Sequence, residues 1–120
     1  MNAQAQRLLG LRGAGRRSEL VDAFGYDTKF AMHCARLGFQ CLELLTTRQL
    51  TLPIQGEPAG WLRAVRRGEV PFEEWWQRSL ELDAQLLARC DDESIPAGPD
   101  RARIERWSVE THLATWNHRT

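Results

Sequence analysis

A row of polar side chains along the stretch 25–45 has the residue types and the spacing of an anion-binding surface. The row consists of Lys29, His33, Arg36, Gln40 and Glu43. At about 100° per residue, these positions fall within an arc of roughly 80° on one helix. Lys, His and Arg donate charge-assisted hydrogen bonds, and phosphate is the simplest anion that such a set binds. We therefore predict that Lys29, His33 and Arg36 contact the phosphate of a nucleotide or of RNA.

The other positions of this stretch are apolar on most sides, which is typical of a helix that lies in a protein interior. A buried helix that keeps one cationic row is expected to direct it into a cleft. The alternative is an ordinary bundle helix whose row faces solvent. Asp27 stands just before the row, and its first interpretation is a helix N-cap.

Two groups of arginines are further candidates for nucleic-acid contact. They are Arg12, Arg16 and Arg17 in a glycine-rich stretch, and Arg63, Arg66 and Arg67 before Gly68. Both groups could follow RNA phosphates. A solvated loop explains the first group as simply, and a solvated helix C-terminus explains the second.

Aromatic side chains near these groups could stack on a base. Tyr26 is the candidate that we place in the nucleotide site, and Trp75 and Trp76 are weaker ones. Aromatic residues at helical spacing more often pack in a core, so this alternative stays open for all three.

The bulk composition describes an ordinary soluble globule. The chain has 120 residues, 42% hydrophobic and 27% charged, with a formal net charge of zero, so no global field directs it to nucleic acid or to a membrane. Residues 1–68 are nonetheless basic and residues 69–120 acidic. We expect a single domain over residues 1–120, a cytoplasmic location, no membrane span and reduced, buried cysteines, and no Cys/His spacing fits a metal site.

Periodicity and capping signals predict a mostly α fold, a compact array of about five helices with one short extended segment. The expected helices of the array cover residues 18–24, 28–45, 61–67, 71–90 and 99–116, and the extended segment covers 50–54. Residues 2–11 can form a further short helix. Residues 91–98 read as an acidic linker.

The two long C-terminal helices differ in their apolar patterns. The predicted core side of helix 71–90 comprises Phe72, Trp76, Leu80, Leu86 and Leu87, widened by Trp75 and Leu82. The last helix instead has apolar residues on two faces, with Ile104 and Trp107 on one and Val109, Leu113 and Trp116 on the other. Such a helix bridges two surfaces, which predicts self-association or a protein partner.

Several segments together resemble a known enzyme family. They are Gly25-Tyr-Asp-Thr-Lys-Phe-Ala-Met-His33 with Arg36-Leu37, then Leu42-Glu-Leu-Leu45, Leu52-Pro53, and Leu62-Arg63 with Arg66-Arg-Gly-Glu-Val70. This pattern resembles the C-terminal part of predicted nucleotidyltransferases of the DNA polymerase β-type superfamily, in a branch associated with RNA repair in bacteria and phages. The resemblance covers roughly residues 5–116, and its first segment is the most specific.

The resemblance implies a two-part enzyme in which these helices complete a nucleotide cleft. The N-terminal part of such enzymes carries a Gly-Ser turn and an Asp-x-Asp pair that holds Mg²⁺ for transfer from a nucleoside triphosphate. This sequence lacks that pattern, and Asp91 and Glu93 are expected to belong to a solvated loop.

We therefore predict no catalytic residues, no metal ligands and no nucleotidyl transfer by this chain alone. It is expected to be a split subunit, a fragment or a derived stand-alone protein, with Mg²⁺ and a nucleoside triphosphate bound only in a complete enzyme that includes a catalytic partner. The alternative is a non-enzymatic helical interaction protein, derived from a phage, that binds RNA or protein.

Overall fold

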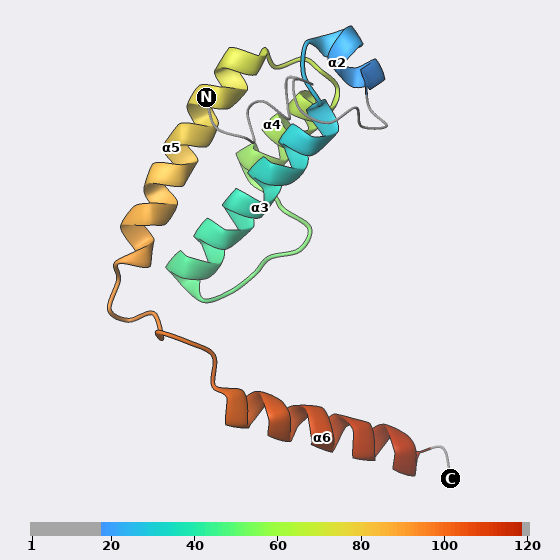
Figure 1. Cartoon of the computed structure of the whole chain (residues 1–120), viewed down its shortest axis with the longest axis vertical. Coiled ribbons are helices and arrows are strands. Elements are labelled where there is room, and N and C mark those ends of the chain that lie inside the picture. The colour runs from blue at the N-terminus through green and yellow to red at the C-terminus, as the bar shows by residue number, and fades with distance from the viewer. Residues whose placement is uncertain (1–17, 119–120) are drawn as a thin grey trace.

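The structure, a computed structural model, describes residues 18–118, which fold into helices joined by turns and loops. The elements are α2 (Ser18–Phe24), α3 (Thr28–Thr47), α4 (Gly56–Arg66), α5 (Phe72–Cys90) and α6 (Arg101–Asn117). No strand occurs among the described residues, which confirms the predicted mostly α fold with about five helices (Figure 1). The predicted helix over residues 2–11 and the arginines Arg12, Arg16 and Arg17 lie outside the described residues.

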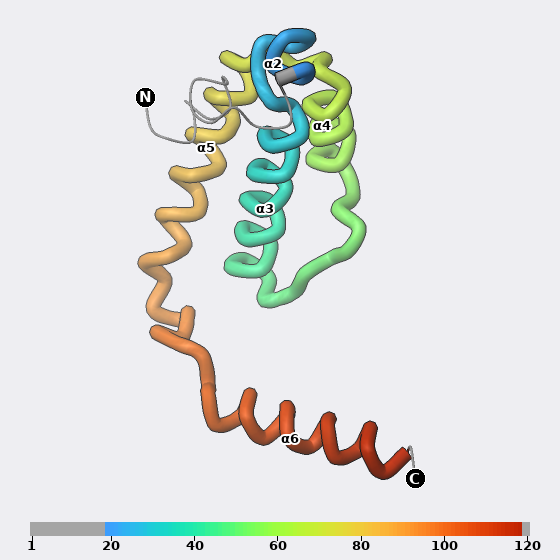
Figure 2. The backbone as a smooth tube through the Cα atoms, turned by 45° about the vertical axis from the view of Figure 1, so that its right-hand side comes forward, coloured from blue at the N-terminus to red at the C-terminus, as the bar shows by residue number. Residues whose placement is uncertain are grey.

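Helix α3 is the central element of the fold. It packs against α4 and α5 along its length and against α2 near its start, and Figure 2 shows it between α4 and α5. Its predicted start is confirmed, because the Phe30 amide donates to the Asp27 carboxylate at 2.9 Å. The helix runs two residues beyond the predicted end, where the Thr47 hydroxyl donates to the Glu43 carbonyl at 2.9 Å.

The core lies where α3, α4 and the start of α5 meet. Its fully or almost fully buried hydrophobic residues are Tyr26, Ala31, Val65, Val70 and Trp75. Two hydrogen bonds cross this core: the Tyr26 hydroxyl donates to the Val70 carbonyl at 2.6 Å, and the Trp75 indole N–H donates to the Ala31 carbonyl at 3.2 Å. Each pairs a buried polar atom with a partner 44 positions away in the sequence, so both fix tertiary packing.

Burial raises the pKa of the Tyr26 phenol, and the nearby Glu74 carboxylate raises it further, so the hydroxyl stays a neutral donor. Tyr26→Phe is expected to lower the free energy of unfolding by about 1–2 kcal/mol, because the Val70 carbonyl would lose its buried donor. Urea denaturation followed by circular dichroism measures this loss. A variant as stable as the wild type would show that this bond contributes nothing.

Helix α5 turns a different side to the core than the sequence predicted. Trp75 and Leu82 are its buried residues, whereas Leu80 and Leu87 are 46% and 62% exposed. The prediction that Leu80 and Leu87 face the core is wrong because α5 contacts α3 along one side only, so its opposite flank stays open. For the same reason α3 is not enclosed all round, and Leu37 and Leu44 are about half exposed.

The other boundaries follow the sequence signals with one exception. Helix α4 begins at Gly56, five residues before the predicted start, because Pro58 lies in the first turn, where its missing N–H costs nothing. Gly68 ends the turn after α4 with a φ of +75°, and a Cβ there would clash with the Phe24 ring of α2. The expectation of buried thiols is wrong for Cys41 and Cys90, which are exposed.

Helix α6 lies apart from the other four helices (Figures 1 and 2). The Asp100 carboxylate caps it by accepting from the Arg103 amide at 3.0 Å, near the predicted start. None of its residues is buried, and Trp107 and Trp116 are 65% and 70% exposed. Within residues 18–118, no helix combines the length and the apolar character that crossing a membrane requires.

Candidate phosphate-binding site

A groove of about 320 Å³ opens between α3, the segment 48–55 and α4. Its lining residues are Met32, Arg36, Gln40, Leu52, Pro53, Ile54, Ala59, Leu62, Arg63 and Arg66. The charged members are all arginines, and two of the predicted groups meet here. Arg36 comes from the polar row of α3, and Arg63 and Arg66 come from the last turn of α4. We refer to this feature as the arginine groove.

Arg36 is the most enclosed of the three arginines. Its Nη2 lies 3.0 Å from His33 Nδ1. A guanidinium only donates, so His33 Nδ1 accepts and the ring proton is on Nε2. The Nε atom of Arg36 is buried and has no hydrogen-bond partner among the described residues. Because this Nε has almost no accessible surface, an anion in the groove would meet the terminal Nη atoms of Arg36 instead.

Arg63 and Arg66 stand three residues apart on α4, which places them on the same side of the helix. Both are exposed, and neither forms an ion pair within residues 18–118. The buried Thr28 hydroxyl donates to the Arg66 carbonyl at 3.4 Å and so holds the end of α4 beside the start of α3. The two arginines therefore supply unneutralised positive charge at the edge of the groove.

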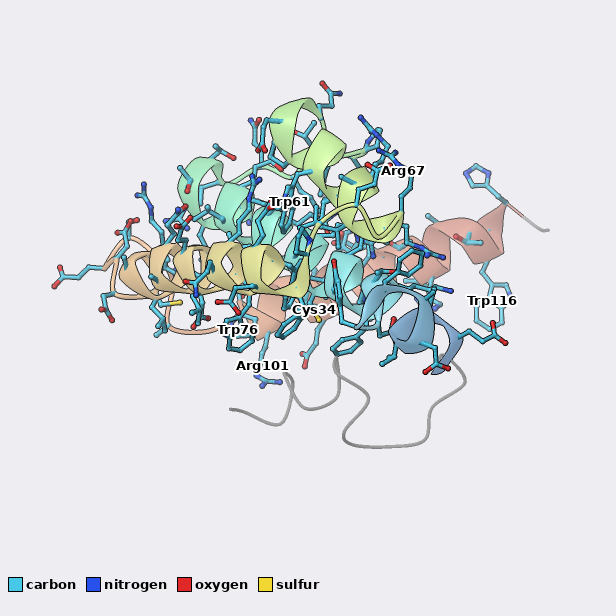
Figure 3. The ribbon with its side chains drawn as sticks, turned by 90° about the horizontal axis from the view of Figure 1, so that it is seen from above. Cys34, Trp61, Arg67, Trp76, Arg101 and Trp116 are labelled. Atoms are coloured by element: carbon cyan, nitrogen blue, oxygen red, sulfur yellow. The ribbon has the colours of Figure 1, made fainter. Side chains whose placement is uncertain are left out.

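Lys29 belongs to the same row of α3 as Arg36, two turns earlier, and is exposed without lining the arginine groove. Arg67 is also outside the groove, because its Nε and Nη2 donate to the Glu69 carboxylate at 2.5 and 2.8 Å. This guanidinium holds the pKa of Glu69 below its usual value. In Figure 3, Arg67 and Trp61 lie on the α4 side of the array.

The prediction that Tyr26 stacks on a base is wrong in this structure. Its side chain is fully buried, its ring lies 5.6 Å from that of Phe72, and its hydroxyl is bound to Val70. No ring face is open to a ligand. Trp75 is likewise a core residue, with its indole bonded to the Ala31 carbonyl.

The floor of the arginine groove is apolar, and the sequence reasoning did not assign it to a site. Leu52, Pro53 and Ile54 supply it from the segment 48–55, of which residues 50–54 were predicted as extended. Met32, which also lines the groove, could have been found from its i, i+4 spacing with Arg36, which puts an apolar residue beside the predicted cation.

A carboxylate holds this floor against α3. The two oxygens of Glu43 accept from the Thr51 amide at 3.1 Å and from the Thr51 hydroxyl at 2.6 Å. These bonds lower the pKa of Glu43. Glu43 was predicted as part of the polar row, and its observed partner is the segment that lines the groove.

The acidic stretch 91–93 is an exposed loop between α5 and α6, as expected. The Asp92 carboxylate accepts from the Ser94 amide at 2.9 Å. This bond closes a local turn over residues 92–94. Within the described part of the chain, no three His, Cys, Asp or Glu side chains come together as potential metal ligands.

The arrangement is chemically suited to holding an anion with an apolar portion: three guanidinium groups above a floor of aliphatic side chains. Comparison with protein families finds none that matches this chain, and comparisons with curated proteins and with solved structures find no significant similarity.

Proposed function

We propose that this chain is the phosphate-facing helical module of a polymerase β-type nucleotidyltransferase and acts with a separate catalytic part. The observation that carries the proposal is the meeting of Arg36 with Arg63 and Arg66 in one groove. These residues come from two segments that the sequence resemblance includes. The catalytic part would supply the Mg²⁺ and the carboxylates of the transfer reaction.

The electrostatics of the groove support a phosphate ligand over a carboxylate. Three arginines without ion-pair partners offer more donors than one carboxylate accepts, whereas a di- or triphosphate has enough oxygens to use several of them. The acids nearest in sequence to the groove are already engaged, Glu43 with Thr51, Glu57 with Arg78 and Glu69 with Arg67. Glu57 and Glu69 are thus paired with arginines outside the groove, whereas Glu43 keeps its negative charge and offsets only part of the charge of the three arginines.

Isothermal titration calorimetry of the wild-type chain with a nucleoside triphosphate and with a single-stranded RNA oligonucleotide tests the proposal. Binding is expected for at least one of them, and the affinity should fall as salt rises, because phosphate contacts release counterions. Binding of neither would rule out the site. Salt-independent binding would rule out phosphate as the contacted group.

A second candidate function is a non-enzymatic interaction protein, which the exposed apolar residues of α6 favour. The two functions differ in what they require of a partner. A nucleotidyltransferase module requires a protein with the Gly-Ser and Asp-x-Asp pattern, and together they should label RNA from a radioactive nucleoside triphosphate. The experiment is repeated with each protein of that pattern whose gene is adjacent to the gene of this chain. If the chain binds phosphate but no RNA is labelled with any of them, the interaction protein is favoured.

A further inference from the structure

A second groove, distinct from the arginine groove, runs between α3 and α5. It has a volume of about 310 Å³, and its lining includes Phe30, Cys34, Gly38, Trp76, Leu80 and Leu86. Gly38 lets the two helices approach closely, since a Cβ there would lie 2.5 Å from a methyl carbon of Leu82. Figure 3 shows Trp76 on the side of the array away from α4. We refer to this second groove as the apolar groove.

Exposed leucines continue the apolar groove on both flanks. Leu37 and Leu44 follow Phe30 at intervals of seven residues on α3, and Leu87 follows Leu80 at the same interval on α5. That spacing keeps each set on one side of its helix. These four leucines are between 46% and 62% exposed, so exposed apolar surface extends beyond the groove along both helices, as it does at interaction sites.

Helix α6 is close in length to α5, which forms one wall of the apolar groove, and none of its residues is buried. Its 17 residues extend about 25 Å and the 19 residues of α5 about 28 Å, at 1.5 Å per residue. An isolated helix this short is marginal in water and needs tertiary packing. Its apolar residues lie on two opposite faces, one with Ile104 and Trp107 and the other with Val109, Leu113 and Trp116.

The loop before α6 is restrained by two hydrogen bonds and two prolines. Arg48 Nη2 at the end of α3 donates to Ser94 Oγ at 2.7 Å, and the Ile95 amide donates to the Asp92 carbonyl at 3.0 Å. Pro96 and Pro99 further restrict the loop. In Figures 1 and 2, α6 lies beyond the ends of α3 and α5 and not along them.

Charge complementarity connects the two surfaces. Asp83 is the one charged residue that lines the apolar groove, and it forms no ion pair within the described residues. On α6, Arg103 precedes Trp107 by four residues and therefore lies on the same side of the helix. A Trp107 side chain placed in the groove would bring Arg103 beside it as a partner for Asp83.

From these observations we infer that two copies of this chain exchange their α6 helices, each placing the Ile104–Trp107 face in the apolar groove of the other. The contact is reciprocal and closes as a two-fold dimer. The remaining face of each α6, with Leu113 and Trp116, packs against its counterpart across the two-fold axis. This arrangement uses both apolar faces of α6, and it rests on residues outside the arginine groove.

The inference is tested by sedimentation equilibrium of the full chain and of two variants, Trp107→Glu on α6 and Leu80→Glu in the groove. The wild type is expected to be dimeric in the micromolar range. Each variant should raise the dimer dissociation constant by about 30-fold or more, as loss of a central aromatic or aliphatic anchor does. Arg101→Glu, on the polar side of α6 that also carries Ser108, introduces the same charge away from both apolar faces; it is the matched control and should remain dimeric.

Mixing the two variants distinguishes exchange from other modes of association. The mixed dimer has one intact interface, formed by the unaltered groove of the Trp107→Glu chain and the unaltered α6 of the Leu80→Glu chain. Reassociation on mixing is therefore expected. A monomeric wild type, variants that remain dimeric, or variants with native circular dichroism spectra that stay monomeric on mixing would each overturn the inference.

Discussion

Trp75→Ala is expected to lower the free energy of unfolding by about 3–5 kcal/mol, the largest effect of any single substitution considered for this protein. The indole is 4% exposed, packs with Phe72, and donates the hydrogen bond that ties α5 to the Ala31 carbonyl of α3. Its removal leaves a cavity and an unpaired buried carbonyl together. Chemical denaturation measures the loss, and a domain of this size is expected to lose most of its stability.

Trp107→Ala is the matched control, because it removes the same side chain from a position that is 65% exposed. In the monomer it should change the stability by less than about 0.5 kcal/mol. Equal losses from both substitutions would mean that the indole of Trp75 does not hold α5 against α3. Measuring at a protein concentration below the dimer dissociation constant separates the change in monomer stability from any change in association.

Arg36→Gln combined with Arg66→Gln is expected to weaken triphosphate or RNA binding by one to a few orders of magnitude. Charge-assisted hydrogen bonds to phosphate contribute roughly 1.5–3 kcal/mol each, and this variant removes one from each wall of the arginine groove. Lys29→Gln should weaken binding less, since Lys29 is on the same row without lining the groove. Calorimetry at fixed salt gives both values.

The matched control replaces Arg101 and Arg106, two exposed arginines of α6, by Gln and so removes the same charge far from the groove. Its affinity should stay near that of the wild type. If this control and the groove variant weaken binding equally, the ligand responds to net charge alone and the site assignment fails. If the groove variant unfolds, Arg36 is a structural residue.

The sequence predicted the helices well because their signals are local. Asp27 caps α3 as expected, and Asp100 caps α6 one residue after the predicted helix start; each cap depends only on the residue and the amide three positions later. The start of α4 was misplaced because glycine and proline usually mark turns, and only the structure shows Pro58 in a first helical turn.

The candidate site was predictable in part. Periodicity placed Arg36 in a polar row, but which neighbours it meets depends on how α4 crosses α3, and no single segment encodes that angle. The burial of Tyr26 follows from its contact with Val70, which is 44 residues away. Likewise, Leu80 and Leu87 have a core-like spacing, and only the open flank of α5 leaves them exposed.

The two bonds between Glu43 and Thr51 determine how the floor of the arginine groove responds to acid. Because they lower the pKa of this carboxyl below its ordinary 4.5, the carboxylate is ionised and both bonds are intact throughout the neutral and mildly acidic range. Their contribution is lost only as the pH falls through that lowered pKa. The two bonds therefore hold the floor of the groove in place at mildly acidic as well as at neutral pH.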